Sequence, residues 1–159
     1  MRKGRRLAVD VGRARVGLAV SDIDGILASP LATIPRSDSV SDTAVEIAAA
    51  VSEFELLEIY VGLPLSLGGG STASTQDAVN VAFALWRQIG VQVRFIDERL
   101  SSVSASANLR LAGRNAKNSR NVIDQEAAAI ILEQALAWEK SSSNIPGTPL
   151  DSQDEESNA

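Results

Sequence analysis

The stretch L-A-V-D-V-G-R-A-R-V-G-L-A-V-S-D, residues 7–22, decides the fold that we expect for this chain. Two short apolar runs, residues 6–11 and 16–21, flank the turn G-R-A-R, which is the pattern of two strands joined as a β-hairpin. Asp10 lies inside the first run, where a carboxylate is costly to bury unless a cation or a basic side chain holds it. The hairpin therefore predicts both the start of a sheet and a charged position on it.

The rest of the sequence predicts helices that alternate with strands. We expect strands at about 25–34, 57–63 and 91–97, and helices at about 42–54, 75–89, 101–112 and 122–140. Three strands linked by turns, followed by alternating helices and strands, predict an α/β fold with a mixed five-stranded sheet and helices on both faces. The first strand is then central, beside the strand at 57–63.

Composition limits the class of protein. The chain has 159 residues, of which 45% are hydrophobic, so we expect one domain over residues 1–140 and a disordered acidic tail over residues 141–159. The absence of His and Cys excludes a Ser-His-Asp triad and makes a structural zinc site unfavourable. No apolar run is long enough for a membrane span, and no secretion signal is evident, so we expect a cytoplasmic protein.

The charges are unevenly distributed along the chain. The formal net charge is −5, but residues 141–159 carry four acidic and no basic residues. Basic residues concentrate in the first fifteen residues and in residues 87–120. This distribution favours a polyanionic ligand, although a solvated basic surface would produce the same counts.

Three carboxylates occupy positions where an acid is informative: Asp10 in the first strand, Glu98 after the strand at 91–97, and Asp124 at the start of the last helix. Singly, each has an ordinary structural interpretation, such as favourable placement at a helix N-terminus for Asp124. Together they favour a cluster at one end of the sheet. Carboxylate oxygens suit Mg²⁺ or Mn²⁺, and two such ions support hydrolysis of phosphodiester bonds.

Four segments resemble the signature blocks of the YqgF family, in the same order and at similar spacing across residues 6–138. They are D-V-G-R-A-R-V-G-L-A-V-S-D (10–22), V-G-L-P-L-S (61–66), F-I-D-E-R-L-S-S-V-S-A (95–105) and V-I-D-Q-E-A-A-A-I-I-L-E (122–133). The resemblance implies an RNase H-like fold and a cytoplasmic bacterial nuclease. It also implies that Asp10, Glu98 and Asp124 are the catalytic acids and the ligands of the divalent metal.

The turn after Asp10 departs from the family, which often has Thr or Lys where this chain has Arg13, Ala14 and Arg15. We expect the basic residues in the acid-bearing segments to bind nucleic acid: Arg13, Arg15, Arg99, Arg114, Lys117 and Arg120. Asp97 is expected to form a salt bridge with Arg94 or Arg99 rather than to join the metal site. Trp86 and Trp138 lie on helical stripes and are expected in the core.

The predicted function is a metal-dependent endonuclease, and the family favours 5′-end processing of pre-16S ribosomal RNA. The alternatives are a Holliday junction resolvase acting on branched DNA and a nucleic-acid-binding module without catalysis. A third alternative, an ATPase with the phosphate-binding hairpin of actin and Hsp70, requires a second lobe for which this chain has no room. RNA and DNA present the same phosphates, so both substrates stay open, as do a monomer and a homodimer.

Overall fold

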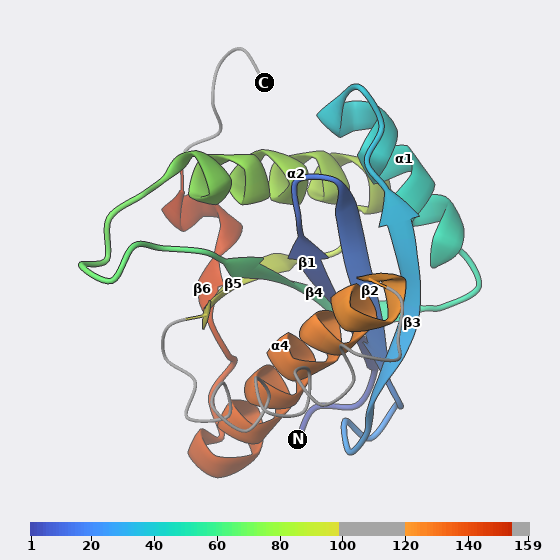
Figure 1. Cartoon of the computed structure of the whole chain (residues 1–159). Helices are drawn as coiled ribbons and strands as arrows, with labels where there is room; N and C mark the ends of the chain where they lie inside the picture. The colour runs from blue at the N-terminus through green and yellow to red at the C-terminus, as the bar shows by residue number, and fades with distance from the viewer. Residues whose placement is uncertain (99–119, 154–159) are drawn as a thin grey trace.

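The computed structural model describes residues 1–98 and 120–153, apart from the side chains of residues 120, 121 and 152. Its six strands form one sheet in the order β3-β2-β1-β4-β5-β6 (Figure 1). The strands are β1 (Arg5–Val11), β2 (Arg15–Ser21), β3 (Ala28–Pro35), β4 (Leu56–Leu63), β5 (Val93–Asp97) and β6 (Thr148–Pro149). The helices are α1 (Val40–Ala50), α2 (Ala73–Ile89) and α4 (Arg120–Ser142), followed by a 3₁₀ turn at Leu150–Ser152.

Strand β1 is central and belongs to both halves of the sheet. It pairs antiparallel with β2, where Asp10 lies opposite Gly17, and parallel with β4, where Val9 lies opposite Val61. Strand β5 continues the parallel half beside β4. The α/β class, the mixed sheet and the central position of the first strand are therefore confirmed.

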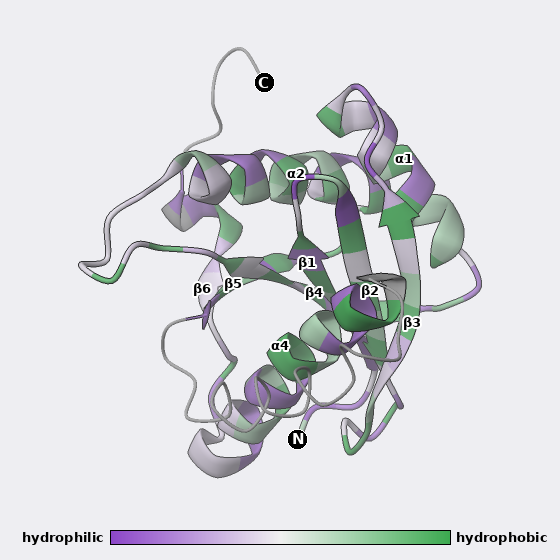
Figure 2. Ribbon diagram, in the orientation of Figure 1, coloured by the Kyte–Doolittle hydropathy of each residue, from purple (hydrophilic) through white to green (hydrophobic). Residues whose placement is uncertain are grey.

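The two faces of the sheet are covered by different helices. Leu7 and Val9 belong to the larger core cluster, which includes residues of α1 and α2, whereas Ala8 belongs to a second cluster with residues of α4. Alternation along β1 thus sends successive side chains to opposite layers. Figure 2 shows hydrophobic residues along the strands and on the helices beside them. No helix in the described ranges is both long and apolar enough to cross a membrane.

The helix ends carry capping interactions that explain where the helices begin. Ser39 caps α1, its side chain accepting a hydrogen bond from the backbone of Asp42, so this helix starts slightly earlier than the predicted range of about 42–54. Thr72 and Thr75 form a reciprocal capping box at the start of α2. Gly90 ends α2 in the left-handed conformation with φ of 79°, as the sequence predicted.

The C-terminal segment differs from its prediction. Residues 141 and 142 extend α4, and β6 adds a sixth strand by pairing antiparallel with Arg94 and Phe95 of β5. Leu150, at 6% exposure, is buried in the larger core cluster. A two-residue strand has no detectable period in sequence, and its position depends on the neighbouring strand edge. The predicted helix at 101–112 lies outside the described residues, as do residues 154–159.

A buried arginine–glutamate network joins the N-terminus to the last turns of α4. The guanidinium of Arg6 is fully buried and donates to Glu139 Oε2 at 2.9 Å. Arg2 donates to Glu139 Oε1 at 2.5 Å and to Glu58 Oε1 at 2.8 Å. The pKa of Glu139 is lowered because the hydrogen bonds and charges from Arg2 and the charge of Arg6 outweigh the effect of burial. This network fastens α4 to the sheet at one end.

Candidate active site

Asp10 lies near the carboxyl end of β1, on the face that α4 covers. It is half-buried, and its pKa is raised to about 7, first by burial and then by the charges of Glu98 and Asp124. A buried carboxylate close to two other carboxylates keeps its proton to a higher pH than an isolated one, because its charged form is poorly solvated and repelled. Three elements distant in sequence therefore bring the three predicted acids to one region of the molecule.

Glu98 reaches this region because β4 carries a glycine beside Asp10. Gly62 follows Val61, the partner of Val9, and so lies next to Asp10 on the same face of the sheet. A Cβ placed on Gly62 would overlap the carboxylate oxygen of Glu98. Burial, and then the charge of Asp97, raise the pKa of Glu98. The absence of a side chain at position 62 is thus what leaves room for Glu98.

Asp124 is placed by a second glycine on the other side of Asp10. Gly17, directly opposite Asp10 in β2, lies so close to α4 that a Cβ there would overlap the carbonyl oxygen of Asp124. The carboxylate of Asp124 accepts a hydrogen bond from Arg15 Nε at 2.7 Å, and both side chains are partly exposed. The two glycines that flank Asp10 therefore define the width of the site.

Arg36 and Asp77 support the turn between Asp10 and Arg15, and the sequence analysis did not identify either of them. The Arg36 guanidinium donates to the Gly12 carbonyl oxygen at 3.0 Å and forms two hydrogen bonds to Asp77 at 2.8 and 3.0 Å. The Arg36 backbone N–H donates to the Ala14 carbonyl oxygen at 2.9 Å. Only the position of Arg36 directly after a predicted strand could have suggested this role.

The predicted nucleic-acid contacts are only partly within the described structure. Arg13 is exposed at the tip of the β1–β2 turn, and Arg15 pairs with Asp124. Arg94, a predicted partner of Asp97, donates to the carbonyl oxygens of Pro146 and Gly147 at 2.6 and 2.8 Å. The predicted residues that lie outside the described parts of the structure are Arg99, Arg114, Lys117 and the side chain of Arg120.

The donor set is suited to a hard divalent cation. Within the described residues, neither Asp10 nor Glu98 forms a salt bridge, so their charge has no basic counterpart there. Carboxylate oxygens are the preferred ligands of Mg²⁺ and Mn²⁺, and a cation would offset the repulsion that raises the pKa of Asp10. In their present conformations, no three acids among the described residues lie close enough together to coordinate one metal ion. The residues fit the ion, but their side chains would have to close around it.

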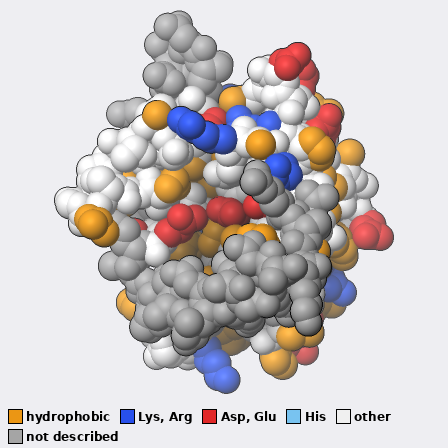
Figure 3. All heavy atoms as spheres, viewed as in Figure 1, with side chains coloured by type: hydrophobic (Ala, Val, Ile, Leu, Met, Phe, Trp, Pro, Cys, Tyr) orange, Lys and Arg blue, Asp and Glu red, His pale blue; other side chains and the backbone are white. Residues whose placement is uncertain are grey.

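The surface of this region combines both signs of charge. Figure 3 shows acidic side chains gathered near the centre of the face, with Lys or Arg side chains above them. Such a surface can attract phosphate groups at its basic edge while acids occupy its centre.

The two tryptophans are not core residues, in contrast to their prediction. Trp86 on α2 is 47% exposed and Trp138 on α4 is 55% exposed. Ala135 and Ile131 of α4 take the core positions instead, at 1% and 4% exposure. Helical periodicity predicts which face of a helix is turned toward the core. It does not predict how much of that face the rest of the protein covers.

A mixed sheet with a central β1, helices on both faces and acids at the end of β1 defines a protein with the RNase H-like fold. This is the fold of RuvC from T. thermophilus, solved in complex with a Holliday junction substrate. That structure matches with a TM-score of 0.59 and 17% sequence identity over 92% of this chain and 99% of the other.

The chain belongs to the RuvX family, described as Holliday junction resolvase, which matches residues 4–138. This confirms the resemblance to the YqgF family that the four sequence blocks indicated. Similar proteins bear the name "Putative pre-16S rRNA nuclease". The one from Leifsonia xyli is 50% identical over 95% of this chain and 97% of its own length. The one from Streptomyces avermitilis is 48% identical over 92% of this chain and 94% of its own length.

Proposed function

We propose that this protein is a divalent-metal-dependent endonuclease that hydrolyses phosphodiester bonds in the 5′-end processing of pre-16S ribosomal RNA. The observation that carries the proposal is the convergence of three acids: Gly62 leaves room for the Glu98 carboxylate beside Asp10, and Gly17, opposite Asp10, contacts the backbone of Asp124. After burial, the charges of Glu98 and Asp124 help to raise the pKa of Asp10 to about 7. The names of the relatives support ribosomal RNA as the substrate. Ribosomal RNA processing also makes the cytoplasm the place of action.

In this proposal Asp10, Glu98 and Asp124 hold Mg²⁺ or Mn²⁺, with two ions in the complete site. Bound ions of this kind lower the pKa of a water molecule and stabilise the leaving oxygen of the cleaved bond. Asp10 supplies an oxygen ligand only after losing its proton, which near neutral pH costs little because its pKa lies at about 7.

Arg13 and Arg15 have separate roles in the proposal. Exposed Arg13 attracts the phosphates of the substrate from the edge of the site. Arg15 orients the Asp124 carboxylate through the 2.7 Å hydrogen bond and keeps it on the side of the site that faces Asp10.

The decisive experiment compares two aspartate variants of the purified protein. With Mg²⁺ or Mn²⁺ and an RNA that spans the 5′ end of 16S ribosomal RNA, the wild type should cleave the precursor and Asp10→Asn should not. Asp24→Asn removes an aspartate that is 54% exposed, outside the acid cluster, and should cleave like the wild type. Equal cleavage by Asp10→Asn would contradict the proposal, as would full activity in excess chelator.

The family description supports a second candidate, resolution of Holliday junctions. Symmetric cleavage of a four-way junction requires two active sites, so this function predicts a homodimer and paired nicks. Offering precursor RNA and a four-way junction to the same preparation, at equal metal concentration, separates the candidates. The substrate with the higher kcat/KM identifies the function.

A further inference from the structure

A pocket of about 660 Å³ opens beside the proposed active site, at the carboxyl ends of β4 and β5. Leu63, the last residue of β4, lies opposite Asp97, the last residue of β5, and both line the pocket. The residue after Asp97 is Glu98, one of the proposed catalytic acids. The pocket lining therefore adjoins the acid cluster along the chain, where Asp97 is followed by Glu98.

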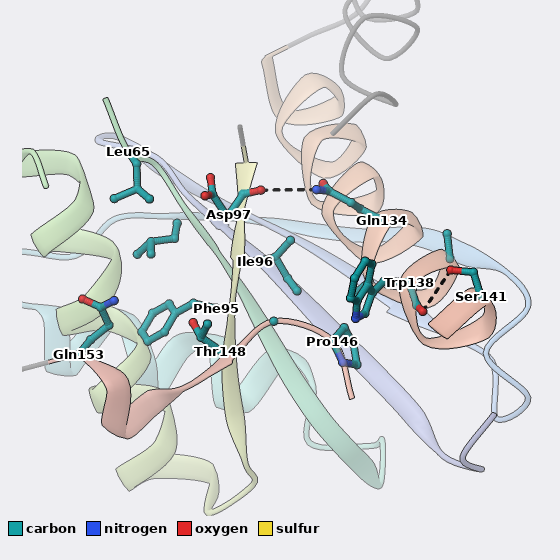
Figure 4. A pocket seen from close by; sticks show the side chains of 14 residues that line it. Leu65, Phe95, Ile96, Asp97, Gln134, Trp138, Ser141, Pro146, Thr148 and Gln153 are labelled. Atoms are coloured by element: carbon teal, nitrogen blue, oxygen red, sulfur yellow. Dashed lines mark hydrogen bonds between the residues drawn. The ribbon is translucent and has the colours of Figure 1, made fainter. Parts of the chain in front are cut away.

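The pocket exists because β6 is short. Strand β6 pairs only with Arg94 and Phe95, so no strand covers β5 from Ile96 onward within the described residues. Helix α4 forms the opposite wall, and Figure 4 shows Trp138 projecting from it toward Ile96 and Pro146. A large aromatic side chain that is 55% exposed is thus presented to the space beside the site.

The lining of the pocket has the composition of a site for a small planar group. Most of it is apolar: Ile96 lies on the same side of β5 as Trp138, whereas Leu65 and Phe95 line the pocket from the other side of the strand. A few polar groups lie at its walls, among them the Gln134 amide, whose nitrogen donates to the Asp97 carbonyl oxygen at 3.4 Å. Binding sites for small ligands commonly combine an apolar wall with a few polar groups in a pocket of this volume.

We propose that this pocket binds an unpaired nucleobase of the substrate, stacked on Trp138, at a position along α4 that is removed from the cleaved phosphate by a few nucleotides of the strand. A base has an apolar π-face for the indole and polar edges for the Gln134 amide, which lines the pocket from α4 as Trp138 does. A base paired within a duplex presents neither its face nor its full edge. The substrate class is consequently a nucleic acid with a single-stranded segment on one side of the cleaved bond.

This inference rests on the proposed nuclease function, and it adds a requirement of its own on the substrate, which must contain an unpaired base. A continuous duplex would reach the acids without filling the pocket, whereas a single-stranded extension of a precursor RNA can place one base there. The pocket therefore favours a single-stranded cleavage region over fully paired junction arms.

The test uses Trp138 as its own reporter. Trp86→Phe in the full chain leaves Trp138 as the only tryptophan, because the sequence contains two. In chelator, so that nothing is cleaved, a short single-stranded RNA should quench the fluorescence of Trp138, and a duplex of the same sequence should quench it far less. Absence of quenching, or equal binding of the duplex, would overturn the proposal.

Substitutions supply the second arm of the experiment. Binding of the single strand, measured by anisotropy of a labelled oligonucleotide, should weaken roughly 5- to 100-fold in Trp138→Ala, the range expected for loss of one stacked base. Trp138→Phe should restore most of the affinity, and Trp86→Ala, with a similarly exposed indole on α2, should leave it unchanged. Unchanged affinity of Trp138→Ala in a folded protein would exclude base stacking at this position.

The outcomes separate the pocket from the catalytic proposal. If Asp10→Asn abolishes cleavage and Trp138→Ala changes nothing, the pocket inference fails alone. If Trp138 is quenched by single strands but no metal supports cleavage, the nuclease proposal fails alone.

Discussion

Two sets of acids lie along α4 on the same face of the sheet, and their environments are opposite. At the end of the helix, Glu139 accepts hydrogen bonds from Arg2 and Arg6, and its pKa is lowered. At the start of the helix, Asp10 and Glu98 form no salt bridge within the described residues, and their pKa values are raised. Carboxylates therefore attach the helix through arginines at one end, whereas at the other end only Asp124 has an arginine partner and Asp10 and Glu98 have none within the described residues.

The difference teaches how to separate structural acids from functional ones. A buried carboxylate with arginine partners is already stabilised, and removing either partner leaves a buried charge. A group of carboxylates without such partners destabilises the folded chain, and a bound cation would offset that cost. Four predictions, from the largest expected effect to the smallest, test this comparison.

The largest effect is expected from Glu139→Gln, which removes the negative charge beside the fully buried guanidinium of Arg6. We expect the free energy of unfolding to fall by about 3–5 kcal/mol, the usual cost of breaking a buried pair from one side. Urea denaturation monitored by circular dichroism measures it. Asp24→Asn breaks the exposed pair with Lys3 and should cost less than about 1 kcal/mol. Equal effects of the two variants would refute the distinction.

The next effect is opposite in sign. Asp10→Asn should stabilise the metal-free protein by roughly 2 kcal/mol at pH 8, because neutralising this side chain removes first the cost of burying its charge and then the repulsion from Glu98 and Asp124. The folded-state pKa of about 7 lies above the ordinary value of 3.8, so ionisation of Asp10 lowers stability as pH rises between those values. The two proteins should thus differ little at pH 4 and most above pH 7. Thermal unfolding in chelator across this range measures the difference, and a constant gap would contradict it.

Gly17→Ala should cost about 1–3 kcal/mol, because the added methyl group would overlap the Asp124 carbonyl oxygen and push the start of α4 away from Asp10. Cleavage should fall together with stability. Gly68→Ala is the matched control, because a Cβ at Gly68 has no heavy atom within 4 Å. Chemical denaturation and a cleavage assay on both variants check the prediction. Wild-type stability in Gly17→Ala would mean that α4 does not pack against β2 at this position.

The smallest effect on stability is expected from Arg15→Gln, which removes the hydrogen bond to Asp124 between two partly exposed side chains. The expected loss is about 0.5–1 kcal/mol. Arg13→Gln, at the exposed tip of the same turn, should leave stability unchanged and weaken RNA binding, with a smaller salt dependence. Denaturation together with binding at two salt concentrations separates the roles. Identical behaviour of the two variants would contradict the separation.

The local periodicity of the chain was sufficient to predict much of the sheet. The apolar run around Asp10 predicted a strand, and in that strand Ala8 packs against residues of α4 while Leu7 and Val9 pack against the other layer. Gly90 was recognisable as the end of a helix from its position alone. These features depend on a few neighbouring residues, which is why the sequence reveals them.

Contacts between distant segments were not predictable in the same way. The Arg2–Glu139 pair joins residues 137 positions apart, and the Arg36–Asp77 pair joins residues 41 apart, with no periodic signal to connect them. The exposure of Trp138 depends on how α4 packs against the sheet, which its helical periodicity does not define. The assignment of Glu98 rather than Asp97 to the catalytic set came from the family blocks and stays a prediction.

The sequence by itself determined the order of the elements and the central hairpin, and it predicted three acids as the site in a chain with no histidine or cysteine. It could do so because strand alternation, helix caps and residue chemistry are local properties. Only the tertiary structure decided that Gly17 and Gly62 flank Asp10, that Arg15 holds Asp124, and that a pocket with Trp138 adjoins the acids. Those facts depend on which distant surfaces pack together, and packing is a property of the whole fold.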